Sequence, residues 1–108
     1  MIPEIDPIEL KARLDADQIP VLVDVREAFE RAIADLPAAG QCHMPMNEVG
    51  QRFAELDPAD EIVVYCRSGA RSASVVGFLL QQGYERVFNL RGGVLGWQEE
   101  VDPSLTRY

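Results

Sequence analysis

Cysteine and histidine are scarce in this chain of 108 residues, which has two cysteines and one histidine. Cys42 and Cys66 are too few for a disulfide framework and lack the spacing of a zinc site, so we predict neither a disulfide nor a bound metal ion. Thiols of this kind stay reduced in the cytoplasm, which is the location we expect for the chain.

Positive charge is also in short supply. Ten lysines and arginines stand against eighteen aspartates and glutamates, which gives a formal net charge of −8. This acidity argues against binding to nucleic acids or anionic membranes, because both require a basic surface. The chain has no apolar run near the ~20 residues of a membrane span and no N-terminal secretory pattern. We expect one globular domain over residues 1–108, with neither nucleic acid nor membrane as a partner.

The most informative stretch of the chain runs from Glu61 to Ser72, and a predicted helix follows it from Ser72 to Gln82. Its first part, residues 62–65, is an unbroken apolar run, which indicates a strand buried on both faces. From Ser72 onward, apolar residues recur at helical spacing. A short glycine-containing loop joins the two elements and begins with Cys66. Open α/β sheets bind ligands at such loops, beyond the carboxyl ends of their strands.

This loop has the composition of an anion-binding site that contains a thiol. Its backbone N–H groups and the positive end of the following helix are expected to point at the space beside Cys66. Two guanidinium groups add positive charge in an otherwise acidic chain. We therefore predict that Cys66 is a nucleophilic thiolate. The predicted binding loop consists of Arg67, Ser68, Gly69, Ala70 and Arg71.

The rest of the chain alternates between strand and helix patterns. Strands are expected at residues 3–5, 21–25, 42–44, 62–65 and 86–90. Helices are expected at residues 7–15, 29–33, 47–56 and 72–82, with Asp6 and Asn47 as N-caps, before a last helix containing Leu95 and Trp97. This alternation predicts an α/β fold, a three-layer α/β/α sandwich with a central, largely parallel five-stranded sheet.

A carboxylate interrupts the second predicted strand at Asp24. An ionised group in such a place requires a partner. One interpretation is structural: Asp24 pairs with an arginine, or Glu27 caps the next helix. The other is that Asp24 and Arg26 lie near the Cys66 loop and hold it in place.

Three blocks of the sequence resemble the rhodanese (thiosulfate sulfurtransferase) family in order and spacing. The first is the loop Cys66-Arg67-Ser68-Gly69-Ala70-Arg71, which is similar to the family's active-site loop. The second is residues 22–27, and the third is the closing block from Gly83 to Trp97. Residues 34–41 depart from the family pattern, because they lack its histidine and contain an apparent two-residue insertion.

The resemblance implies a rhodanese-like fold and a sulfurtransferase activity. Cys66 would take a sulfane sulfur from a small anionic donor, thiosulfate or a persulfide, and hold it as a covalent persulfide. The acceptor would be cyanide, a thiol or a protein sulfur carrier. The chemistry implied by the family needs no separate cofactor.

Other functions are compatible with the same residues. A rhodanese-like module can serve only for binding or regulation, although such modules typically lose the cysteine that this chain retains. A cysteine-based phosphatase or arsenate reductase also uses a cysteine and an arginine, but its loop has one residue more than the four between Cys66 and Arg71. Further hypotheses are a redox sensor at Cys66, a base role for His43 and a resolving role for Cys42.

Overall fold

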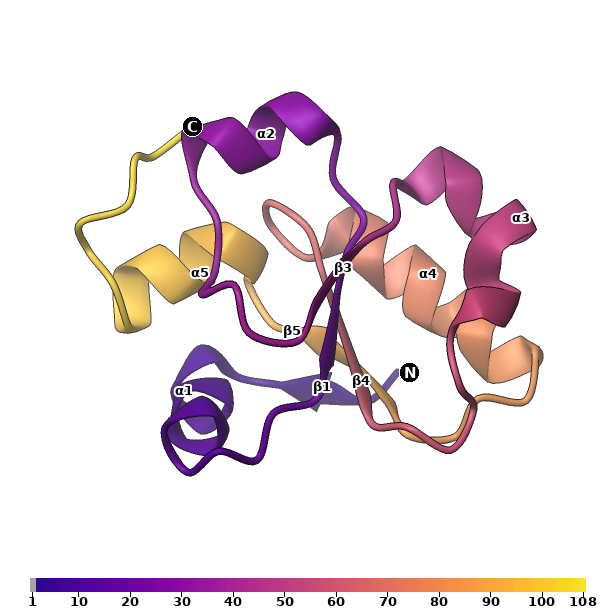
Figure 1. Ribbon diagram of the computed structural model, residues 1–108. Coiled ribbons are helices and arrows are strands. Elements are labelled where there is room, and N and C mark those ends of the chain that lie inside the picture. Colours follow the sequence, from indigo (N-terminus) through magenta and orange to yellow (C-terminus); the bar gives the residue numbers. More distant parts are fainter. Residues whose placement is uncertain (1) are drawn as a thin grey trace.

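A single parallel sheet forms the centre of the molecule. The computed structural model describes residues 2–108 and is drawn in Figure 1. Its five strands pair in the order β1-β5-β4-β2-β3, and every pairing is parallel. The strands are β1 (Glu4–Ile5), β2 (Val21–Asp24), β3 (Gln41–His43), β4 (Ile62–Tyr65) and β5 (Val87–Leu90).

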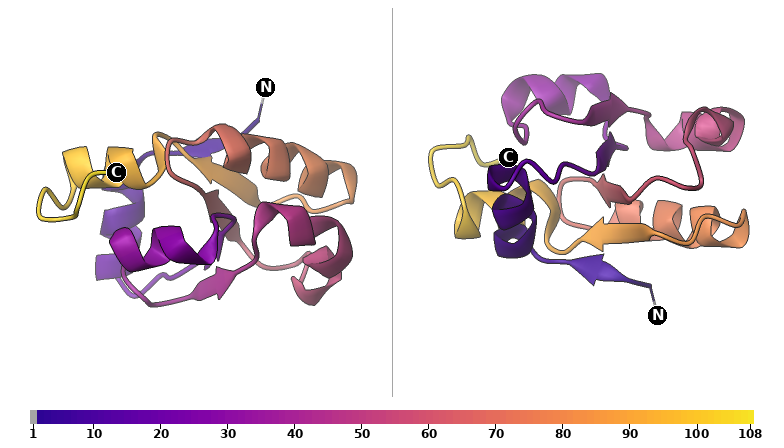
Figure 2. Two further views of the ribbon diagram at one scale, coloured as in Figure 1. Left: turned by 90° about the horizontal axis from the view of Figure 1, so that it is seen from above. Right: turned by 60° about the horizontal axis from the view of Figure 1, so that its bottom comes forward.

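Helices cover both faces of this sheet. Figure 2 shows α1, α2 and α5 on one side and α3 and α4 on the other. The helices are α1 (Pro7–Asp15), α2 (Ala28–Ile33), α3 (Val49–Arg52), α4 (Ala70–Gln81) and α5 (Gly93–Glu100). The three-layer α/β/α sandwich with a five-stranded parallel sheet is therefore confirmed.

The central strand β4 explains why the sheet is covered twice. All four of its residues are buried. Ile62 and Val64 belong to the apolar cluster under α3 and α4, whereas Val63 and Tyr65 belong to the cluster that includes Leu10 of α1 and Trp97 of α5. An unbroken apolar strand is stable only between two helical layers, as the sequence predicted.

The prediction of one continuous helix over residues 47–56 is wrong. This segment consists of two 3₁₀ turns around one short α-helix: η1 (Met46–Glu48), α3 (Val49–Arg52) and η2 (Phe53–Glu55). The carbonyl of Val25 accepts the N–H of Met46 at 3.0 Å, so the turn starts earlier than expected. Asn47 is therefore no N-cap, and Pro45 takes that position without a side-chain hydrogen bond.

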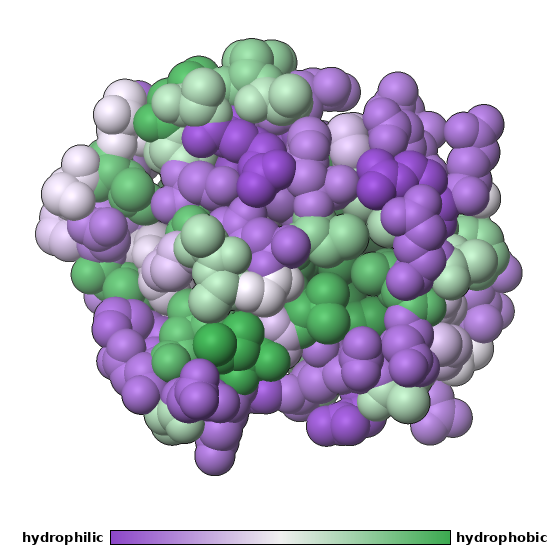
Figure 3. Space-filling view, viewed as in Figure 1, coloured by the Kyte–Doolittle hydropathy of each residue, from purple (hydrophilic) through white to green (hydrophobic). Residues whose placement is uncertain are grey.

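The face of the molecule shown in Figure 3 is mostly polar, and apolar side chains gather on it in a few places. One is α2, where Phe29 and Ile33 are exposed. Another is a groove with a volume of about 200 Å³, lined by Met46, Val49, Gly50, Ser74, Val75 and Phe78. Within residues 2–108, no helix is long and apolar enough to cross a membrane.

Candidate active site

Cys66 is buried at the end of β4, with 1% of its surface exposed. The chain turns within three residues and enters α4 at Ala70, two positions earlier than the expected start at Ser72. Gly69 makes the turn with a positive φ of 107°, a conformation that side chains with a Cβ rarely adopt. The tight turn places the first N–H groups of α4 next to the thiol.

The sulfur atom of Cys66 accepts hydrogen bonds from this turn. The backbone N–H of Gly69 lies 3.1 Å from Sγ, and the hydroxyl of Ser72 lies 3.4 Å from it. Burial raises the pKa of the Cys66 thiol, but donation by the Ser72 hydroxyl and by the N–H groups of Ser72, Gly69 and Ser68 outweighs burial. The pKa is therefore below that of an ordinary cysteine.

The first turn of α5 holds the loop from the other side. The N–H groups of Val94 and Leu95 donate to the carbonyls of Cys66 and Arg67 at 2.9 and 3.0 Å. Gly93 permits this approach, since a Cβ at that position would lie 2.4 Å from the Cys66 carbonyl oxygen. The loop is thus fixed by two helix N-termini.

The two loop arginines bind partners other than the sulfur. Arg71 donates two hydrogen bonds of 2.8 Å to Glu30 on α2. This pairing lowers the pKa of the buried Glu30 carboxyl to about 2. Arg67 donates to the backbone oxygen of Tyr108 and lies 5.3 Å from the centre of its ring. Neither guanidinium donates to Cys66 Sγ, so the sequence-based expectation holds for the backbone amides and not for direct arginine contact.

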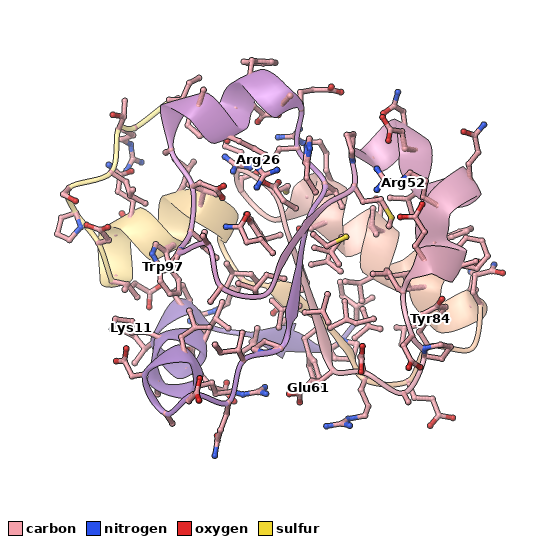
Figure 4. All side chains as sticks on the ribbon, viewed as in Figure 1. Lys11, Arg26, Arg52, Glu61, Tyr84 and Trp97 are labelled. Carbon is pink, nitrogen blue, oxygen red and sulfur yellow. The ribbon has the colours of Figure 1, made fainter. Side chains whose placement is uncertain are left out.

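The expectation that Asp24 has an arginine partner is confirmed. Arg26 and Asp24 are both fully buried and form a two-pronged ion pair at 2.9 Å. Figure 4 shows Arg26 between α2 and the sheet. Arg26 also donates to the Tyr108 hydroxyl at 2.8 Å, and that hydroxyl donates to Glu30 at 3.1 Å. Asp24 and Arg26 are therefore linked to the loop arginines through Tyr108 and Glu30, and the N–H of Val25 between them donates to the carbonyl of Tyr65, the residue before Cys66.

The capping alternative for Glu27 is present as well. Glu27 is the N-cap of α2 and forms a capping box with Glu30. The atypical segment 34–41 is held by buried groups: Arg26 donates to the Ala34 carbonyl at 2.8 Å, and the Tyr65 hydroxyl donates to Asp35 at 2.7 Å.

Neither His43 nor Cys42 forms a hydrogen bond with the Cys66 thiol in the described part of the chain. The Nε2 atom of His43 lies 2.7 Å from the carbonyl oxygen of Arg26, and no hydrogen bond joins His43 to Cys66 within residues 2–108. Cys42 is a half-buried free thiol packed against the apolar core. Across the same residues, no group of three or more His, Cys, Asp or Glu side chains is arranged to hold a metal ion.

Four residues of this site were not predicted from the sequence: Ser72, Asn89, Glu30 and Tyr108. Asn89 carried a usable signal, because it is a polar residue inside an apolar strand, as Asp24 is. Ser72 directly follows the predicted loop. Glu30 and Tyr108 carried no signal, because only tertiary structure brings α2 and the tail to Arg71 and Arg67.

Comparisons with known proteins agree with this geometry. A protein named sulfurtransferase from Allochromatium vinosum is 43% identical over 105 residues, which cover 97% of this chain and 96% of that protein. The crystal structure of a rhodanese-related protein from Thermoplasma volcanium is 30% identical in sequence and has a TM-score of 0.81. The match covers 94% of this chain and 95% of that protein.

A larger protein contains a similar domain. The structure of an NAD-dependent persulfide reductase from A. fulgidus is 31% identical in sequence and has a TM-score of 0.72. The match covers 89% of this chain and 16% of that protein. Residues 6–100 match the model of the rhodanese-like domain. The chain therefore belongs to the rhodanese-like domain family.

Proposed function

We propose that the protein is a sulfurtransferase that carries a sulfane sulfur as a persulfide on Cys66. The observation that carries the proposal is the set of donors around one buried sulfur atom, with the Gly69 amide at 3.1 Å and the Ser72 hydroxyl at 3.4 Å. Because these donors favour the thiolate, the reaction needs no separate general base. The relative from Allochromatium vinosum, which is named a sulfurtransferase and matches nearly end to end, supports the same reaction class.

The first step is a displacement at sulfur. The Cys66 thiolate attacks the outer sulfur of the donor, a sulfur–sulfur bond forms, and the rest of the donor leaves with the electron pair of the broken bond. With thiosulfate the leaving group is sulfite, a stable anion that requires no proton. In the second step an acceptor nucleophile takes the outer sulfur, and Cys66 departs as a thiolate. The loop amides hold the negative charge in both states.

The charges around the loop favour a small anionic donor. Arg71 is neutralised by Glu30. Arg67 donates to the backbone oxygen of Tyr108 and forms no ion pair with an aspartate or glutamate side chain in the described part of the chain, and we propose that its positive charge attracts thiosulfate or an anionic persulfide. We propose cyanide as an assay acceptor and a thiol or a sulfur-carrier protein as the natural one. We further propose that the reaction takes place in the cytoplasm without a cofactor.

The direction of Arg71 also favours sulfur transfer over phosphate or arsenate chemistry. A phosphatase of this type needs its loop arginine to bind the oxyanion. Here Arg71 is bound through both of its terminal nitrogens to Glu30. The space at Cys66 is bounded by the amides of a loop with only four residues between Cys66 and Arg71, which suits a single sulfur atom.

The test is the intact mass of the protein after incubation with thiosulfate, with Cys66→Ser and Cys42→Ser measured in parallel. We expect a gain of about 32 Da, one sulfur, in the wild type and in Cys42→Ser, no gain in Cys66→Ser, and reversal by cyanide. If neither thiosulfate nor a small-molecule persulfide adds mass while iodoacetamide still alkylates Cys66, the sulfurtransferase proposal is wrong. A binding module would then be the better explanation.

A further inference from the structure

The hydroxyl group of Ser72 lies between two acceptors and has only one hydrogen to donate. Its oxygen is 3.4 Å from Cys66 Sγ and 2.5 Å from Oδ1 of Asn89, a residue of β5. Ser72 is fully buried and Asn89 is 3% exposed, so bulk water does not serve either group. Whichever acceptor lacks the hydrogen must be satisfied in another way.

The orientation of the Asn89 amide is fixed by Gly69. The Asn89 Nδ2 atom donates to the Gly69 carbonyl at 3.2 Å, and the same carbonyl accepts the N–H of Ala73 in the first turn of α4. A reversed amide would place Oδ1 against that carbonyl oxygen, acceptor against acceptor. Oδ1 must therefore face Ser72, and only the Ser72 hydrogen can satisfy it.

We propose that Asn89 is a positioning residue that competes with Cys66 for the hydroxyl hydrogen of Ser72. While Cys66 is a thiol, its S–H donates to the Ser72 oxygen, and the Ser72 O–H donates to Asn89. When the thiol proton leaves for solvent, Sγ can only accept. The Ser72 hydrogen then rotates to the sulfur, and Oδ1 of Asn89 loses its donor; no covalent bond of Ser72 changes.

This competition deepens the proposed function and rests on it in one respect. In a persulfide the charge lies on the outer sulfur, and Sγ is neutral, so the Ser72 hydrogen returns to Asn89. The thiolate is then the only state in which Asn89 is unsatisfied. Asn89 thus makes the thiolate a stronger nucleophile toward the donor and a poorer leaving group from the persulfide.

Apart from Cys42, which is serine in every protein compared by alkylation, the charged and titratable groups around Cys66 stay the same in the variants proposed below. They come from α2, the loop, α4, the tail, β2 and β3, and are Glu30, Arg67, Arg71, Tyr108, Asp24, Arg26 and His43. The positive charge of Arg71 interacts with the Cys66 thiolate through space. A difference between variants therefore reports on the hydroxyl hydrogen.

The test is a double-mutant cycle on the ionisation of Cys66. The rate of alkylation by iodoacetamide is measured by intact mass against pH in a Cys42→Ser background, which leaves Cys66 as the only thiol. Asn89→Leu keeps the approximate shape but removes the competing acceptor, so we expect the pKa of Cys66 to fall and its acid dissociation constant to rise about tenfold. Ser72→Ala should lower that constant about tenfold. In the double variant, Asn89→Leu should have no further effect.

Two outcomes would overturn the proposal. One is an unchanged or raised pKa in Asn89→Leu; the other is an equal shift in the presence and absence of Ser72, which indicates a structural effect through Gly69. Ser74→Ala is the matched control, because this exposed serine of α4 lies one turn from the loop. Alkylation requires no sulfur donor, so failure of the sulfurtransferase proposal would leave this result readable.

A measurement without substitution at Asn89 covers the case in which Asn89→Leu does not fold. The side-chain amide signal of Asn89 is followed by NMR as Cys66 is titrated. We expect the signal to move with the ionisation of Cys66 in the wild type and in Ser74→Ala, and to stay still in Ser72→Ala. No movement in the wild type, or equal movement in Ser72→Ala, would refute the competition.

Discussion

Replacing Glu30 by glutamine should weaken the folded state in a way that depends on pH. The substitution keeps the shape of the side chain and removes its charge. A carboxyl group whose pKa falls from 4.5 to about 2 on folding stabilises the folded state by about 3 kcal/mol at neutral pH. The partner Arg71 is 36% exposed, so solvent screening reduces the expected loss in Glu30→Gln to about 2 kcal/mol.

The pH dependence distinguishes this charge effect from lost packing. A depressed carboxyl pKa stabilises the fold fully above pH 4.5, and the stabilisation is lost as the pH falls toward 2. The difference between wild type and Glu30→Gln should therefore shrink by about 1.4 kcal/mol for each pH unit below that value. Urea unfolding followed by the fluorescence of Trp97, the only tryptophan, measures it between pH 7 and pH 3.5.

A constant difference across that range would refute the reasoning, because it would assign the loss to packing. Glu100→Gln is the control, since Glu100 is exposed and forms no ion pair in the described part of the chain. Its stability should follow that of the wild type at every pH.

Two further predictions concern the frame around the thiol. Gly93→Ala should lower the free energy of unfolding, measured by thermal unfolding, by about 2 kcal/mol or more and should slow the alkylation of Cys66. The reason is that the φ of Gly93 is +59° and a Cβ there would meet the Cys66 carbonyl. The control Gly77→Ala has open space at its Cβ within α4 and should instead raise the free energy of unfolding by about 0.5–1 kcal/mol. A neutral result for Gly93→Ala would contradict the close contact. Tyr108→Phe should cost about 1–2 kcal/mol in urea unfolding, because the hydroxyl no longer joins Arg26 to Glu30. The pKa of Cys66 should stay the same in that variant, and a shift as large as in Ser72→Ala would show that this network reaches the sulfur.

The fold was predictable because its signals are local. The apolar run 62–65 predicts a strand that is covered on both faces. Asp6-Pro7 predicts the start of α1, where the Asp6 carboxylate accepts a hydrogen bond of 2.7 Å from the N–H of Glu9. The segment 46–55 was less predictable because a tertiary contact, the Val25 carbonyl, decides where its first turn begins. The pattern of neighbouring residues in the sequence does not contain information about such a contact.

The site divides in the same way. The position of Cys66 and the donors of its loop follow from a strand, a turn and a helix that are adjacent in the sequence. The partners of the arginines do not, because Glu30 is 41 positions from Arg71 and Tyr108 is 41 positions from Arg67. Positive charge near a cysteine therefore indicated a functional loop, while the side chain that touches the sulfur is the uncharged Ser72.

Helix α5 helps to orient the backbone N–H groups that donate to the Cys66 sulfur, although no side chain of α5 donates to Cys66. In a planar trans peptide the carbonyl and the N–H point in opposite directions. The N–H of Leu95 holds the Arg67 carbonyl at 3.0 Å, and this turns the N–H of Ser68, in the same peptide unit, toward Sγ, where it lowers the pKa of the thiol. The distance between α5 and the loop is set by Gly93, whose missing Cβ lets the backbones touch. The closing glycine block of the sequence is thus part of the sulfur site through peptide geometry, and a shift of α5 would rotate the amides away from the thiolate that they stabilise.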